Sequence, residues 1–435
     1  MRITFIRPHL TSIPAADALE PLVFGVLARL TPPDVELKLY DVRLESVPYD
    51  EPTDLVAMTV DTFTAKLSYQ IAAKFRQRGI PVVMGGYHPT LLPDEVSQYA
   101  DSIAIGDAET LWPQIVRDAR VKKLQKRYQS LETPNLVGLQ PDRSIFKGKN
   151  YPSLRMVQFG RGCRFSCDFC SIHAYYGTNL YRRAIDDVVQ EIASLPPNSH
   201  VFLVDDNLFV NENLATELFQ AITPLKASWV CQISVDIAQN PRLLNLMAKS
   251  GCCGVFVGLE SLNADNLAQM RKKWTVKQND YPAALRQFRE HDIMVFGSFV
   301  FGYDADTSDI FDRTFEFAMQ SRLTLCHFNP LIPTPATPLY ARLESEKRLL
   351  HKRWWLDDEY RYGEMVFRPK YLTPEQITDN CFRLRRAFNT YPAMLHRFAA
   401  PQALHHPFIY WAANLVSRRE IFNKQGQPLG NGAPF

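Results

Sequence analysis

The chain has 435 residues, of which 46% are hydrophobic, so it can build two or three domains with well-packed cores. Its net charge of +3, with 22% charged residues, does not favour a polyanionic partner, and we expect no nucleic acid binding. We find neither a signal-peptide pattern at the N-terminus nor an apolar stretch long enough to span a bilayer. We therefore expect a soluble, cytoplasmic protein.

The first 120 residues alternate short apolar runs with amphipathic stretches. The predicted strands are 3–6, 35–40, 55–59, 82–84 and 102–105. Strands that alternate with helices and are apolar throughout predict an α/β domain, a Rossmann-like doubly wound parallel sheet. Such sheets bind ligands at the carboxyl ends of their strands. The candidate ligand-binding residues at that edge are Thr59, Gly85, Gly86, His88 and Gly106.

Residues 121–152 are basic and then rich in Pro, Asn and Gly, which is typical of a linker. A second alternating series fills residues 153–345. Its predicted strands are 156–160, 201–204, 230–234, 254–258, 295–301 and 325–331. Six such strands predict a partial (β/α)6 barrel of the TIM type, with its chemistry at the C-terminal strand ends. Residues 346–435 lack strand character and mix aromatic with charged residues, so we expect a mostly helical region that helps to enclose a substrate.

Three of the eight cysteines fall within eight positions, directly after the first barrel strand. These are Cys163, Cys167 and Cys170. At this spacing, three thiolates can bind three irons of a [4Fe–4S] cluster and leave the fourth iron open to a cofactor. A zinc knuckle completed by His173 is the alternative, although nothing else in the chain is typical of a small zinc module.

The C-x3-C-x2-C loop, with an aromatic residue before its last cysteine, resembles that of the radical S-adenosylmethionine superfamily. The resemblance extends along the barrel, and it implies that S-adenosylmethionine binds beside the cluster. Phe169 would lie against the adenine, and Asp205 or Asp206 would face the methionine ammonium. The further cofactor contacts that the resemblance implies follow the third and fourth strands and are Ser234, Asp236 and Glu260.

Several of these residues have a structural alternative. Asp205 or Asp206 could cap the helix that follows the strand. Glu260 could pair with a lysine or arginine of the barrel. Cys326 and His327 lie on the sixth strand and are candidate catalytic residues, as a hydrogen donor or a substrate contact, and packing in the core is their alternative.

The first domain resembles the cobalamin-binding domain that precedes the barrel in one class of radical enzymes. The resemblance rests on the segments 85–90, 92–95 and 105–109. Glycines at strand ends allow a nucleotide tail to approach the backbone closely. Many cobalamin domains carry a histidine that binds cobalt, but Arg43 stands at the nearest match here, and arginine has no lone pair for a metal. A Rossmann-like domain without cofactor is the alternative.

Together these resemblances imply a cobalamin-dependent methylase that uses a 5′-deoxyadenosyl radical to methylate an unactivated carbon of a hydrophobic small molecule, like the hopanoid and tetrapyrrole methylases. One S-adenosylmethionine would supply the methyl group and another the radical. A radical cyclase or oxidoreductase of tetrapyrrole or lipid biosynthesis is the alternative, followed by a non-enzymatic cobalamin or iron–sulfur sensor. A methylthiotransferase is disfavoured because no cysteine precedes Cys163.

Two kinds of partner follow from this interpretation. An electron donor such as flavodoxin or ferredoxin would reduce the cluster. The aromatic segment 406–411, followed by Arg418 and Arg419, would suit an apolar substrate or a contact with a membrane surface.

Overall fold

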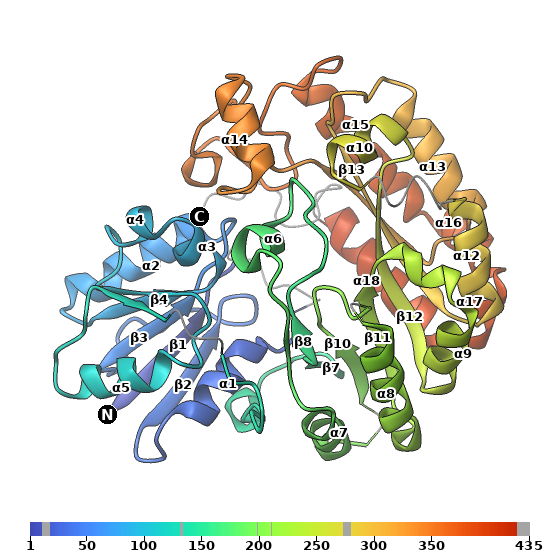
Figure 1. Cartoon of the computed structure of the whole chain (residues 1–435). Helices are drawn as coiled ribbons and strands as arrows, with labels where there is room; N and C mark the ends of the chain where they lie inside the picture. Colours follow the sequence, from blue (N-terminus) through green and yellow to red (C-terminus); the bar gives the residue numbers. More distant parts are fainter. Residues whose placement is uncertain (11–17, 131–133, 198, 210, 273–279, 424–435) are drawn as a thin grey trace.

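A computed structural model describes the chain except for residues 11–17, 131–133, 198, 210, 273–279 and 424–435. It contains two six-stranded parallel sheets, each flanked by helices, and a helical C-terminal region. The first sheet forms the blue lobe in Figure 1, and the second lies across the molecule from it. Helix α6 (Ser171–Tyr176) lies between the two lobes.

The first sheet has the strand order β2-β1-β3-β4-β5-β6. Its strands are β1 (Arg2–Arg7), β2 (Glu36–Asp41), β3 (Leu55–Thr59), β4 (Val82–Gly85), β5 (Ser102–Ile105) and β6 (Arg127–Gln129). The helices of this lobe are α1 (Leu22–Leu30), α2 (Ala65–Gln77), α3 (Tyr87–Leu91), α4 (Pro93–Val96) and α5 (Trp112–Arg120). Strand order 2-1-3 around β1, with buried strands covered on both faces, confirms the predicted Rossmann-like sheet.

Strand β6 was not among the predicted strands, and it lies within the segment predicted to be a linker. It has three residues, and only its central Tyr128 is buried. The flanking residues are exposed, so the segment carries no apolar run that would indicate a strand. Pairing with β5 and packing of Tyr128 into the core of the first lobe place it in the sheet.

The second sheet has the order β14-β13-β12-β11-β10-β7, so its strands follow one another in chain order as in an open barrel. They are β7 (Leu154–Val157), β10 (His200–Leu203), β11 (Ser228–Ile233), β12 (Cys252–Glu260), β13 (Met294–Phe301) and β14 (Leu325–Pro330). The helices between them are α7 (Ile185–Ser194), α8 (Glu212–Ile222), α9 (Pro241–Lys249), α10 (Ala264–Gln269), α12 (Tyr281–Glu290) and α13 (Ile310–Gln320). All six predicted barrel strands are confirmed.

The cysteine loop and α6 lie between two short strands, β8 (Gly160–Arg161) and β9 (Tyr181–Arg182), which pair antiparallel. The pairing of β8 with β9 brings the two ends of this segment together. Short 3-10 helices occur at η1 (Arg143–Phe146), η2 (Thr223–Leu225), η3 (Val235–Gln239) and η4 (Trp354–Leu356).

The C-terminal region is mostly helical, as expected. Helix α14 (Pro338–Ser345) follows the last barrel strand, and the helices of the C-terminal region are α15 (Pro374–Phe388), α16 (Tyr391–Phe398), α17 (Pro401–His405) and α18 (Pro407–Asn423). A capping box of Thr373 and Gln376 starts α15, which packs against β14. The buried Arg397 guanidinium donates to the carbonyl oxygens of Thr324 and Phe388, at 2.6 and 2.8 Å, and so ties α16 to the barrel. Among the described residues, no helix is long and apolar enough to cross a membrane.

Candidate active site

The three cysteines of the loop line one cavity of about 440 Å³ at the C-terminal ends of the barrel strands. All three are free thiols, and Cys167 is buried. Three thiols that converge on one cavity are the donor set of a [4Fe–4S] cluster with one open iron. Burial raises the pKa of the Cys167 thiol to about 12, so an iron that binds there would displace a proton.

Hydrogen bonds to two separate parts of the barrel, after β10 and after β13, fix the loop. The Gly162 N–H donates to Asp206 Oδ2 at 2.7 Å, and Tyr303 Oη donates to Asp168 Oδ1 at 2.6 Å. Gly162 has a φ of +87°, and a Cβ there would lie 2.1 Å from the carbonyl oxygen of Asn179. Only glycine fits this position, because other residues disfavour that φ and would clash with the backbone.

The two acids after β10 have different positions. Asp205 is fully buried, accepts a hydrogen bond from the Phe159 N–H at 2.8 Å and does not line the cavity. Burial raises its pKa to about 6. Asp206 does line the cavity, so it is the acid that can face a cofactor. The helix-cap alternative is wrong for both, because the side chain of Asn211 caps α8.

The two cofactor contacts predicted after the third strand also separate. Ser234 lines the cavity and accepts a hydrogen bond from Asn207 Nδ2 at 3.1 Å, and the same amide lies 3.8 Å from Cys163 Sγ. Asp236 is not among the lining residues, because its carboxylate turns to an ion pair with Arg164. The structure therefore places Ser234, but not Asp236, beside the cysteines.

Glu260 lines the cavity and forms an ion pair with Lys272, with Oε1 and Nζ 2.7 Å apart. The alternative that it pairs with a basic residue is thus confirmed, yet the pair itself faces the cavity. Glu260 has a left-handed φ of +65°, which ends β12 at this point. Burial by itself would lower the pKa of Lys272, but the charge of the Glu260 carboxylate raises it. Lys272 therefore stays protonated, and a buried cation lies beside the cysteines.

The two candidate catalytic residues point to opposite faces of β14. His327 lines the cavity with the cysteines. Cys326 is buried in the core behind the sheet, since neighbouring residues of a strand alternate between its faces. For Cys326, the structure therefore shows the alternative, packing in the core. Phe169 lines the cavity, with Lys272 Nζ 6.0 Å from its ring centroid.

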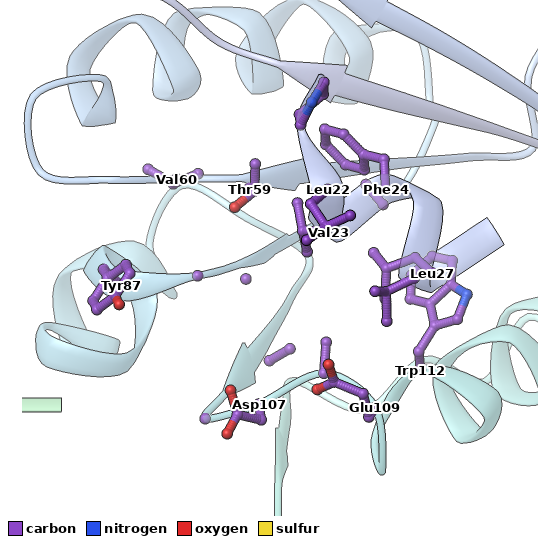
Figure 2. Close-up of a pocket in the computed structure, with 18 of the residues that line it drawn as sticks. Leu22, Val23, Phe24, Leu27, Thr59, Val60, Tyr87, Asp107, Glu109 and Trp112 are labelled. Carbon is purple, nitrogen blue, oxygen red and sulfur yellow. The ribbon is translucent and has the colours of Figure 1, made fainter. Parts of the chain in front are cut away.

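A second cavity of about 550 Å³ lies at the carboxyl ends of β3, β4 and β5. Thr59, Gly85, Gly86 and Gly106 line it, as predicted from the sequence. Figure 2 shows a polar side formed by Asp107 and Glu109, and an apolar side that includes Phe24, Leu27 and Trp112. Glycine strand ends that lead to an apolar interior fit a bulky cofactor with a nucleotide tail.

Arg161, two residues before the first cysteine, joins the two lobes within this cavity. Its guanidinium lies 3.0 Å from Asp107 Oδ1 and 2.5 Å from Glu109 Oε1, both on the loop after β5. Tyr176 on α6 donates to Asp107 at 3.2 Å. Asp206 lines both cavities, so the second cavity and the cysteine cavity meet at this residue.

Two residues of the first domain do not reach the second cavity. The buried His88 ring lies 3.1 Å from both Tyr69 Oη and Glu95 Oε1, and the residue is not among those that line the cavity. The structure thus places His88 of α3 in a polar network with Tyr69 of α2 and Glu95 of α4, outside the lining of the second cavity. Arg43 pairs with Asp41 at 2.6 Å and is not a lining residue either.

Several residues that line the two cavities were not among the predicted site residues. In the cysteine cavity these are Asn207, Gln232, Lys272 and Ser298, and in the second cavity Tyr87, Arg161, Tyr175 and Tyr176. Asn207 and Arg161 directly adjoin recognised motifs, so their positions could have indicated them. Lys272 belongs to the basic run 271–273, which has the same pattern as a solvated surface, so the sequence gives no sign of its burial.

Comparisons with known proteins agree with this geometry. Residues 157–318 match the radical SAM superfamily. The chain is 31% identical to bacteriochlorophyllide d C-12(1)-methyltransferase of Chlorobaculum tepidum, over 87% of this chain and 84% of that protein. It is 25% identical to the C-8(2)-methyltransferase of the same organism, over 77% and 78%.

Among solved structures, the radical S-adenosylmethionine methyltransferase TsrM of Kitasatospora setae shares the fold. It has a TM-score of 0.71 at 16% identity, and the match covers 97% of this chain and 98% of that one. The chain therefore belongs to the radical SAM superfamily and, within it, to the family of methyltransferases that includes the Chlorobaculum tepidum enzymes.

Proposed function

We propose that this protein is a cobalamin-dependent radical S-adenosylmethionine methylase of an unactivated carbon in a hydrophobic small molecule. The observation that carries the proposal is the junction of two cavities at Asp206. Three free thiols line one cavity, and glycine strand ends and an apolar interior line the other. An ordinary methyl transfer would need neither a cluster nor cobalt, and a radical rearrangement would need no methyl carrier.

The residues of the chain have separate tasks in this proposal. When bound, the cluster with S-adenosylmethionine would supply the 5′-deoxyadenosyl radical, and cobalamin would carry the methyl group. Cys163, Cys167 and Cys170 would hold the cluster. The Glu260–Lys272 pair would offer opposite charges to the ammonium and carboxylate of S-adenosylmethionine. Arg161 would fix the cysteine loop against the first lobe, and Asp206 would fix it against the barrel, which orients the two cavities.

The relatives indicate the class of substrate. Two methyltransferases with 31% and 25% identity act on bacteriochlorophyllide d, a large hydrophobic ring system. We infer a substrate of the same kind for this chain. The cyclase or oxidoreductase alternative uses the same cluster and cofactor, and the mass of the product separates it from methylation.

Three further inferences concern the surroundings of the enzyme. An external one-electron donor such as flavodoxin or ferredoxin would reduce the cluster. A reducing compartment such as the cytoplasm would keep the eight cysteines free. The exposed side chains of Leu395, Leu404 and Phe408 on α16–α18 would suit transient contact with a membrane surface that holds the substrate.

The experiment uses anaerobically reconstituted protein with reductant, cobalamin, methyl-labelled S-adenosylmethionine and bacteriochlorophyllide d. We expect a product heavier by one methylene that carries the label. After correction for uncoupled cleavage, 5′-deoxyadenosine and S-adenosylhomocysteine should form in near-equal amounts. An unlabelled product with abundant 5′-deoxyadenosine and no S-adenosylhomocysteine would contradict methylation and favour the cyclase or oxidoreductase alternative.

A further inference from the structure

A third cavity, of about 300 Å³, lies where the two lobes and the C-terminal region meet. Phe63 comes from the first lobe, Phe169 and Cys170 from the cysteine loop, and Tyr360 and Tyr362 from the segment before α15. The remaining walls come from Ser171, Val300, Asn329, Pro330, Leu331, Ile332, Thr334, Gly363 and Arg385. Aromatic and aliphatic side chains thus enclose a small number of polar groups, which is typical of a binding site for an organic molecule.

Arg385 on α15 brings a positive charge to the wall of this cavity. The residue is only 3% exposed, and its Nη2 donates to Asn329 Oδ1 at 3.0 Å. Burial lowers the pKa of its guanidinium, as expected for a cation in an apolar environment. An arginine fork is the side chain best suited to bind a carboxylate through two parallel hydrogen bonds.

Two further donors lie in the same wall. Asn329 uses its carbonyl oxygen to accept from Arg385, so its amide nitrogen is directed elsewhere as a donor. The hydroxyl of Tyr360 is buried and has no hydrogen-bond partner among the described residues. A buried hydroxyl without a partner is costly, and a ligand oxygen at this place would satisfy it. None of the described residues that line the cavity is acidic.

We propose that Arg385, Asn329 and Tyr360 bind a carboxylate at one end of an otherwise apolar, aromatic substrate. The proposal rests on the proposed function in taking the bound molecule to be the substrate. The cavity is small, so it accommodates the acidic end, and the rest of the molecule lies outside it. Phe169 and Cys170 line both this cavity and the cysteine cavity, so the carboxylate would anchor the substrate beside the cluster.

Binding of a chlorin acid and of its ester tests the proposal without turnover. The probes are pyropheophorbide a, a chlorin with one carboxylic acid, and its methyl ester, titrated into the reconstituted protein and followed by absorbance. We expect the acid to bind at least about tenfold more tightly than the ester, because a hydrogen-bonded charge pair is lost in the ester.

Two pairs of variants locate the preference. Arg385→Gln should weaken binding of the acid about 10–100-fold and leave the ester unchanged. Tyr360→Phe, which keeps the ring that packs on Trp354, should weaken the acid by roughly 3–10-fold. The controls are Arg386→Gln and Tyr371→Phe, two exposed residues of the same region that do not line the cavity, and they should not change either affinity.

Equal binding of acid and ester by the unmodified protein would overturn the proposal, as would an Arg385→Gln variant that keeps the preference. If Arg385→Gln fails to fold, an unchanged acid preference in Tyr360→Phe would overturn it as well. The proposed function is tested by product formation and this proposal by binding. An enzyme that methylates without preferring the acid therefore contradicts this proposal alone.

Discussion

The cysteine cavity and the glycine-lined cavity differ in what makes each of them specific. The first depends on side chains, since three thiols and a buried Glu260–Lys272 pair supply the groups that can bind a cofactor. The second depends on shape, since Gly85, Gly86 and Gly106 expose backbone at its rim and apolar side chains line its interior. Removal of one ligand should abolish the function of the first, whereas the second should respond by degrees to changes of shape.

The difference also explains why the cysteine spacing predicted the first cavity. The second was supported only by the position of its domain before the barrel. Ligands need defined side chains at fixed positions along the chain, so they produce a motif. A backbone cradle needs only small residues at strand ends, which many doubly wound sheets share. The predictions below test this contrast between side chains and backbone.

Loss of a cluster thiol should have the largest effect. Changing Cys163, Cys167 or Cys170 to Ala removes one of three protein ligands, and we expect the full [4Fe–4S] content to be lost in each variant. Iron and sulfide analysis of the anaerobically reconstituted protein, with the spectrum of the reduced cluster, measures this. Cobalamin binding should persist, because no cysteine is among the described residues that line the second cavity.

The control for this experiment is Cys253→Ala, a buried cysteine that packs in the core away from the cluster cavity. It should retain about four irons and four sulfides. A full cluster in a variant that lacks all three loop cysteines would show that the ligands lie elsewhere in the chain.

Arg161→Gln should have the next largest effect, because it leaves Asp107 and Glu109 buried without their shared cation. Breaking a buried ion pair costs about 3–5 kcal/mol, and urea unfolding should show the loss as a lower midpoint. Arg164→Gln is the control, since the half-exposed Arg164 should contribute less than about 1 kcal/mol. Adding Glu109→Gln to Arg161→Gln should recover part of the stability. An unchanged urea midpoint in Arg161→Gln would show that this ion pair does not stabilise the contact between the two lobes.

Both sheets and the cysteine loop could be predicted from the sequence, because apolar runs and cysteine spacing are local patterns. Strand β6 could not, since a three-residue edge strand with one buried residue has no such pattern. The placement of His88 was wrong because a polar residue after a strand can turn toward a ligand or into the core. Only tertiary contacts, here to Tyr69 and Glu95, decide between these outcomes. The pairing of Arg161 with acids more than 50 positions earlier is equally non-local.

A smaller effect is expected from Gly86→Ala at the rim of the second cavity. Gly86 has a φ of +105°, and a Cβ there would lie 3.0 Å from both Thr59 Oγ1 and the Val60 carbonyl oxygen. We expect cobalamin to bind about tenfold more weakly as the rim shifts, while cluster content stays unchanged. Gly79→Ala is the matched control, because it adds the same kind of backbone strain at a φ of +74° with no atom nearby. It should lower stability by about 1–2 kcal/mol and leave cobalamin affinity intact. Equal loss of affinity in both variants would attribute the effect to strain alone.

The smallest expected effect is the absence of a spectroscopic signal, because the second cavity should supply no side-chain ligand to cobalt. No histidine is among the described residues that line this cavity. Arg43, at the place of the usual cobalt-binding histidine, has no lone pair and is held by Asp41. Bound cob(II)alamin should therefore show no nitrogen superhyperfine splitting from a protein histidine in its electron paramagnetic resonance spectrum, and 15N labelling of the protein separates such a signal from that of the cofactor's own base. Arg43→Gln should leave that spectrum unchanged, because the side chain does not line the cavity. A splitting that changes when the protein is labelled with 15N would mean that a side chain does reach cobalt, and the contrast between the two cavities would then fail at its most specific point.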